Sequence, residues 1–132
     1  MDESLEINGS VPKLKSQVIQ ELLCTEMWCN GILEEPANVI YIKANNAWFR
    51  HYYDYGIVFW RKEETPPTDY EMEELKCTFK VVDLLAKYQL NDLSFLAIES
   101  KAIIGGSETE FKFSNGRTIV FSNIDDVTKY RT

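Results

Sequence analysis

The sequence is poor in the residues on which several kinds of functional site depend. It has one histidine, three cysteines and six glycines in 132 residues. Any histidine-based triad or metal site must therefore use His51, which lies inside the aromatic run 48–53, where a structural histidine is the simpler interpretation. No phosphate-binding glycine loop, dinucleotide fingerprint or Gly-x-Ser-x-Gly elbow is present. We therefore predict no catalytic residue, and a small enzyme with a motif-free pocket stays an alternative.

Cysteine is too scarce for a disulfide framework. Cys24, Cys29 and Cys77 are odd in number, a pattern that suits a reducing compartment. We expect all three to be small buried hydrophobic residues. No Cys-x-x-Cys pair is present, so a tetrahedral zinc set is not predicted. The sequence thus predicts neither a metal nor another cofactor.

Basic residues are also fewer than acidic ones. Fourteen basic residues stand against 21 acidic ones, which gives a net charge of −7. Such a protein repels phosphate backbones and anionic lipid headgroups, so we predict no nucleic-acid or membrane partner. The chain also lacks an apolar run long enough to span a bilayer, and its first residues lack the pattern of a signal peptide. The expected localisation is cytoplasmic.

What the sequence does contain indicates one domain, 1–132, with a mainly β to α+β fold. The clearest signal is an antiparallel meander of three strands, at 39–43, 48–53 and 57–61, because these segments are rich in β-branched and aromatic residues. Asn45-Asn46 and Asp54-Tyr55-Gly56 supply the two turns. We expect antiparallel meander and hairpin sheets with at most one N-terminal helix.

A second hairpin is predicted near the C-terminus. Strands at 110–113 and 118–121 flank Asn115-Gly116, which is the strongest short hairpin signal. Further strands are expected at 93–104 and 75–82. A single helical turn is expected at 84–88.

The segment 13–27 fits both a helix and a strand, because its apolar residues satisfy both periodicities. Pro12 favours a helix start. An echo of this segment near residue 90, and of Asn45-Asn46 at Asn115-Gly116, instead favours a strand in a duplicated β-unit. The hypothetical halves are 12–62 and 75–123, and we slightly favour the strand.

An acidic stretch, 63–74, separates these halves. It holds six acids and no base, and its Pro66-Pro67 pair opposes regular strand pairing. We expect an exposed loop. The residues that we predict to form an interaction surface are Glu63, Glu64, Asp69, Tyr70, Glu71, Glu73, Glu74 and Trp60.

The leading hypothesis is a non-enzymatic protein-binding module, of the inhibitor or immunity type, whose partner has a basic surface. Clustered charge of one sign speeds association, while aromatic anchors supply affinity. A solvated loop that only aids solubility is the simpler interpretation of the same stretch. The alternative function is a small-ligand-binding β-barrel or cone with an aromatic-lined pocket, suggested by the aromatic residues on both faces of the meander.

Overall fold

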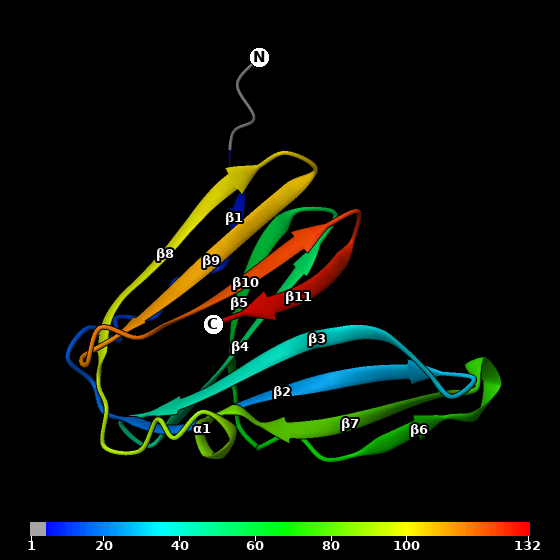
Figure 1. The fold of residues 1–132 in the computed structure, drawn as a ribbon, viewed down its shortest axis with the longest axis horizontal. Helices are drawn as coiled ribbons and strands as arrows, with labels where there is room; N and C mark the ends of the chain where they lie inside the picture. The colour runs from blue at the N-terminus through cyan, green and yellow to red at the C-terminus, as the bar shows by residue number, and fades with distance from the viewer. Residues whose placement is uncertain (1–4) are drawn as a thin grey trace.

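The computed structural model describes residues 5–132 and is built mainly of β-strands, which confirms the mainly β prediction. Two sheets face each other in Figure 1 and enclose the core. The helical elements are short: α1 spans Leu84–Lys87 and the 3₁₀ helix η1 spans Glu73–Leu75. No helix in residues 5–132 has the length and apolar character needed to cross a membrane.

The larger sheet has seven strands in the order β1-β5-β4-β3-β2-β7-β6. All neighbours are antiparallel except β1 and β5, which are parallel. The bounds of its strands are β1 Ile7–Asn8, β2 Ile19–Cys29, β3 Ile32–Ala44, β4 Ala47–Asp54, β5 Ile57–Glu63, β6 Tyr70–Met72 and β7 Cys77–Asp83. Its two edge strands, β1 and β6, are its shortest, a common protection against edge-to-edge pairing.

The smaller sheet is a four-stranded antiparallel meander in the order β11-β10-β9-β8. Its strands are β8 Phe95–Ile103, β9 Gly106–Phe113, β10 Thr118–Ile124 and β11 Val127–Arg131. The β9–β10 hairpin encloses Asn115-Gly116, as predicted, and Gly116 has a φ of +88°. A Cβ on Gly106 would overlap the Asn123 carbonyl oxygen, so the start of β9 requires glycine.

The predicted meander is present as β3, β4 and β5. Asn45 and Asn46 join the first two of these strands with φ values of 50° and 57°, a left-handed conformation that asparagine tolerates well. Tyr55 and Gly56 join the next two, also with positive φ. Local turn chemistry thus sets the register of this part of the sheet.

The ambiguous segment contains a turn at Ser16 and then enters β2 at Ile19, and no helix forms between residues 5 and 18. In β2, Leu22 and Cys24 alternate onto the core face, opposite Ile42 and Ile40 of β3. Strands β3 and β7 flank β2, and their backbone groups form hydrogen bonds with its N–H and C=O groups. In a helix, the same groups would be paired within the segment itself. Pro12 therefore does not begin a helix.

The two four-stranded meanders β2–β5 and β8–β11 run in the same chain order. Their first strands begin at Ile19 and Phe95, which match in the echo seen in the sequence. Asn45-Asn46 and Asn115-Gly116 each join the second strand to the third. A duplication of one β-unit is consistent with this arrangement and stays a hypothesis.

The core lies between the sheets and is rich in aromatic rings. Phe111 of β9 is fully buried at its centre, with ring centroids within 6.4 Å of His51, Trp60, Phe95 and Phe121. Several polar contacts also join the sheets. Among them, the Tyr53 and Thr109 hydroxyl oxygens are 2.7 Å apart, and the Thr128 N–H donates to the buried Glu35 carboxylate. Paired polar groups of this kind fix how the sheets align.

The cysteine prediction is right for one residue and wrong for two. Cys24 is buried in the core, and burial raises the pKa of its thiol to about 12, so it is an unreactive thiol. Cys29 and Cys77 instead form a disulfide. The antiparallel pairing of β2 with β7 places these two residues directly opposite each other. The number of cysteines in the sequence does not show which strands pair or in which register, so it could not predict this disulfide.

Candidate functional site

A six-residue connection, 64–69, carries the chain from β5 to β6 across the larger sheet, and we call it the strap. Strands β4, β3, β2 and β7 lie between β5 and β6, so a flat sheet would require a crossing of about 24 Å. The chain from Glu63 to Tyr70 reaches roughly the same distance when extended. Pro66-Pro67 favours that extended conformation. The strap therefore crosses four strands with only six residues, in irregular backbone that bends at Glu64 and Thr65.

The acidic stretch is less irregular than predicted. Glu63 belongs to β5, Tyr70–Met72 form the edge strand β6, and Glu73–Leu75 form η1. The prolines lie in the strap, where no strand pairing occurs, as expected. Asp69 has a structural role, since its Oδ1 accepts a hydrogen bond of 2.8 Å from the Val81 backbone N–H. This bond fixes the far end of the strap onto β7.

At the end of the sheet, the β2–β3 turn lies beside the β6–η1–β7 connection. We call residues 29–33 and 71–77 the tip. The Asn30 N–H donates to the Lys76 carbonyl oxygen at 3.0 Å, and the Cys29–Cys77 disulfide joins the two parts. Four large hydrophobic side chains of the tip are exposed, namely Ile32, Leu33, Met72 and Leu75. Ile32 and Leu75 are the most open of them, at 63% and 61%.

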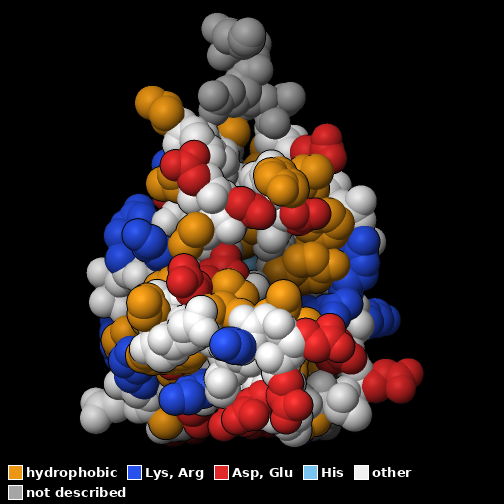
Figure 2. All heavy atoms as spheres, turned by 90° about the vertical axis from the view of Figure 1, so that its right-hand side faces the viewer, with side chains coloured by type: hydrophobic (Ala, Val, Ile, Leu, Met, Phe, Trp, Pro, Cys, Tyr) orange, Lys and Arg blue, Asp and Glu red, His pale blue; other side chains and the backbone are white. Residues whose placement is uncertain are grey.

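Acidic side chains of the tip and strap lack ion pairs within residues 5–132. Of the six acids in the stretch 63–74, Glu63 has an ion pair with a basic side chain there, through a contact of 3.7 Å with Arg50. Glu64, Glu71, Glu73 and Glu74 are exposed and have none there. Figure 2 faces this end of the molecule and shows acidic side chains gathered along its lower part, next to hydrophobic ones.

On the smaller sheet, acidic side chains form ion pairs with basic ones. Glu108 contacts both Lys101, at 3.2 Å, and Arg131, at 3.5 Å. Lys112 lies between Glu99 and Glu110, at 3.7 and 3.6 Å. Within residues 5–132, these acids of the smaller sheet are thus paired with basic side chains, whereas Glu71, Glu73 and Glu74 at the tip are not.

The residues predicted for the interaction surface fall in separate places: Glu63 is in β5, Glu64 and Asp69 are at the two ends of the strap, and Tyr70, Glu71, Glu73 and Glu74 are at or next to the tip. Tyr70 is half exposed and stacks on Phe79, with ring centroids 4.5 Å apart. Trp60 does not belong to this surface. It is 1% exposed and stacks on His51 in the core, because its position in β5 points toward the smaller sheet.

The aromatic run of the meander divides between the two faces of the larger sheet. The Tyr53 and Trp60 side chains point inward and pack in the core. Tyr52 and Phe59 lie on the outer face, stacked at 4.9 Å. The His51 ring contacts both of these rings, Tyr53 and Trp60, and Trp60 also stacks with Phe111. Side chains therefore fill the space that a ligand would need between the inward-facing rings.

His51 is a fully buried part of this core. Its Nδ1 lies 3.1 Å from the Phe59 carbonyl oxygen, which can only accept, so Nδ1 carries the proton. Its Nε2 lies 3.0 Å from the Tyr53 hydroxyl and accepts its hydrogen bond. Burial lowers the pKa of His51 to about 3. The imidazole is therefore a neutral structural group at physiological pH.

This buried histidine predicts a loss of stability in mild acid. The folded pKa of about 3 lies below the unfolded value of 6.5, so the unfolded chain binds the proton first and stability falls as pH drops below about 6.5. We expect the free energy of unfolding to be about 2 kcal/mol lower at pH 5 than at pH 7. Urea unfolding at both pH values measures it.

The matched variant is His51→Phe, which should lose this part of the pH dependence. Imidazole proton shifts measured by NMR give a second readout, since the His51 ring of the folded protein should not titrate above pH 5. Parallel pH profiles for the two proteins, or an imidazole that titrates near pH 6.5, would contradict the prediction.

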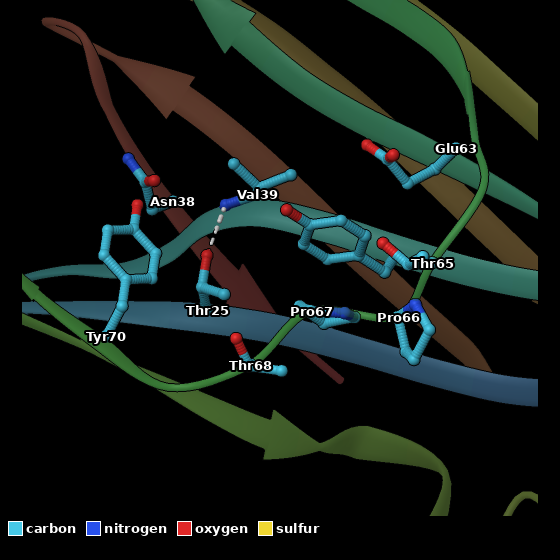
Figure 3. A pocket seen from close by; sticks show the side chains of 10 residues that line it. Thr25, Asn38, Val39, Glu63, Thr65, Pro66, Pro67, Thr68 and Tyr70 are labelled. Atoms are coloured by element: carbon cyan, nitrogen blue, oxygen red, sulfur yellow. Dashed lines mark hydrogen bonds between the residues drawn. The ribbon is translucent and has the colours of Figure 1, made fainter.

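A small pocket lies between the strap and the outer face of β2 and β3 (Figure 3). Its volume is about 220 Å³, below the roughly 300–1,000 Å³ typical of sites for drug-sized ligands. Its walls are mostly hydroxyl, amide and aromatic groups, contributed by Thr25, Asn38, Val39, Tyr41, Glu63, Thr65, Pro66, Pro67, Thr68 and Tyr70. Burial is the main cause that raises the pKa of Tyr41, and its hydroxyl is therefore protonated.

Residues 5–132 contain no group of three or more histidine, cysteine, aspartate or glutamate side chains placed to hold a metal ion. The hydrophobic residues of the tip were not predicted from the sequence. One local signal could have found them: Asn30-Gly31 between Cys29 and Ile32 is a hairpin signal of the same kind as Asn115-Gly116.

Comparisons with protein-family models, with curated proteins and with solved structures found no match to this chain. Any account of its function therefore depends on the chemistry of its own surface.

Proposed function

We propose that this protein is a non-enzymatic protein-binding module, of the inhibitor or immunity type, that meets a basic surface of its partner with the tip and the strap. The observation that carries the proposal is the group of acids without ion-pair partners in residues 5–132, Glu64, Glu71, Glu73 and Glu74. Three of these acids, Glu71, Glu73 and Glu74, belong to the tip, together with its exposed hydrophobic residues.

The two kinds of side chain have complementary effects on binding. Charge of one sign attracts an oppositely charged partner over about a Debye length and raises the association rate. Hydrophobic side chains such as Ile32 and Leu75 lose contact with water in the complex and slow its dissociation. A basic surface with an apolar centre is the partner that this combination fits.

The location of the protein remains a proposal as well. The sequence favours the cytoplasm, but the Cys29–Cys77 disulfide argues for an oxidising compartment, where such bonds persist. Alkylation of the protein in denaturant directly after cell lysis, without reductant, followed by mass spectrometry, distinguishes the two. One modified cysteine would favour the oxidising compartment, and three would favour the cytoplasm.

The proposal predicts that charge removal at the tip slows association. The tip variant carries Glu71→Gln, Glu73→Gln and Glu74→Gln of the tip together with Glu64→Gln of the strap, all at exposed positions. Proteins captured from the producing cells by the wild type identify the partner, and its association rate is then measured at low and high salt. We expect the tip variant to associate at least about tenfold more slowly at low salt, with a weaker salt dependence.

The control variant removes the same number of charges from exposed positions outside the tip, with Glu6→Gln, Asp54→Asn, Asp92→Asn and Asp125→Asn. It should retain most of the wild-type rate. Equal association rates for the tip and control variants would refute the proposed surface, even if a partner is captured.

A further inference from the structure

The pocket under the strap has a chemistry that suits a cation. Its one charged lining residue is Glu63, and none of its lining residues is a lysine, arginine or histidine. In Figure 3, Glu63 and Tyr70 lie on opposite sides of the pocket, with the strap along one wall. A ligand there would meet a carboxylate at one end and an aromatic ring at the other.

The Glu63 carboxylate has room for another donor. Its Oε1 accepts a hydrogen bond of 3.2 Å from the Glu64 backbone N–H. Its Oε2 has the contact with Arg50 Nε at 3.7 Å, which is too long for a hydrogen bond. Arg50 Nε is buried and makes no hydrogen bond in the described part of the chain. Oε2 can therefore accept an N–H from outside the protein.

The remaining walls fit a flat group with several donors. Tyr41 and Tyr70 offer aromatic rings, and the threonines of the strap offer hydroxyl oxygens. A guanidinium group stacks on tyrosine rings and presents five N–H donors in one plane. A lysine ammonium has no plane to stack and fewer donors. The volume of about 220 Å³ suits one side chain better than a larger ligand.

We propose that this pocket binds an arginine side chain of the partner. The inference rests on the proposed function and deepens it, because it names the residue of the basic surface that enters the protein. The pocket adjoins the tip, since Tyr70 lines it and is followed directly by Glu71. An arginine at the edge of the interface would thus be held while the apolar centre packs against the tip.

Arg50 opposes this binding, because its positive charge lies close to the Glu63 carboxylate that would receive the arginine. Replacement of Arg50 by glutamine removes that competitor and leaves the pocket lining unchanged. The inference therefore predicts opposite effects for two neighbouring changes: Glu63→Gln weakens arginine binding, whereas Arg50→Gln strengthens it. A merely structural ion pair would give the same sign for both.

The test uses amide NMR spectra of the intact protein, titrated with N-acetyl-arginine amide. The matched neutral probe is N-acetyl-citrulline amide, which has nearly the same shape without the charge. We expect arginine to shift the amides of Thr25, Val39, Thr65 and Thr68, and citrulline to leave them in place. Glu63→Gln should weaken arginine binding roughly fivefold or more, and Arg50→Gln should tighten it.

Two controls keep this result separate from the test of the proposed function. Glu99→Gln removes an exposed charge on the smaller sheet and should leave arginine binding unchanged. A variant with Glu71→Gln, Glu73→Gln and Glu74→Gln should still bind arginine, because none of these residues lines the pocket. Equal shifts with citrulline, tighter binding of N-acetyl-lysine amide, or shifts away from the strap would overturn the inference.

Discussion

Loss of the Cys29–Cys77 disulfide is expected to lower the free energy of unfolding by about 4 kcal/mol. The bond joins residues separated by 48 positions, so it removes much of the conformational freedom of the unfolded chain between them. It also holds the end of β7 against β2, at the tip. The measurement is urea unfolding of the wild type with and without reductant, and of a Cys29→Ala/Cys77→Ala variant.

Two comparisons isolate the effect of the bond. Reductant should not change the stability of the double variant, which has no disulfide to lose. Cys24→Ala should keep the response to reductant, since Cys24 is a free thiol in the core. A wild type that is equally stable with and without reductant, or whose Cys29 and Cys77 are alkylated in the folded protein without reductant, would contradict the prediction.

Phe111→Ala is expected to destabilise the fold by a similar amount, about 4 kcal/mol. The Phe111 ring is fully buried and contacts aromatic side chains from both sheets. Its truncation leaves a cavity that two sheets, held by their own ladders, cannot close. Urea unfolding monitored by tryptophan fluorescence measures the loss, because the Trp60 ring lies 6.4 Å from Phe111.

The control for this variant is its neighbour in β9. Lys112 points to the opposite face of the sheet, where it contacts Glu99 and Glu110 through partly exposed ion pairs. Lys112→Ala should therefore change stability by only about 0.5 kcal/mol. If both variants lost the same stability, the core would not be centred on Phe111.

Sequence reasoning succeeded where neighbours along the chain decide the structure. Asn45-Asn46 and Asn115-Gly116 favour the backbone conformation of tight turns, and the segments beside them have the composition of strands. The meander β3–β5 and the hairpin β9–β10 follow from these local preferences. The short helix α1 follows in the same way, with Asp83 accepting a hydrogen bond from Ala86 at its start.

Contacts between distant residues were beyond the same reasoning. The sequence could not place β7 beside β2, and without that pairing it could not predict the disulfide between Cys29 and Cys77. The sequence also could not show which side chains of an aromatic strand face the core. Alternate side chains point to opposite faces, but the core face is known only once another sheet covers it. Trp60 was therefore grouped with surface residues, although it faces the core.

The acidic stretch shows both outcomes in one segment. Its composition predicted an exposed surface, and Glu64, Glu71, Glu73 and Glu74 are exposed. Its composition did not predict two structural roles: Asp69 fixes the chain onto β7, and Tyr70 begins an edge strand. These roles depend on where the chain goes after it leaves β5.

The shortness of the strap also constrains how its length can change. The segment between β5 and β6 has only six residues with which to cross the four strands beneath it. A shortened version would pull one outer strand away from the sheet, whereas added residues would only bulge into solvent. Natural variation in length at this point should therefore be one-sided, with insertions accepted and deletions removed by selection.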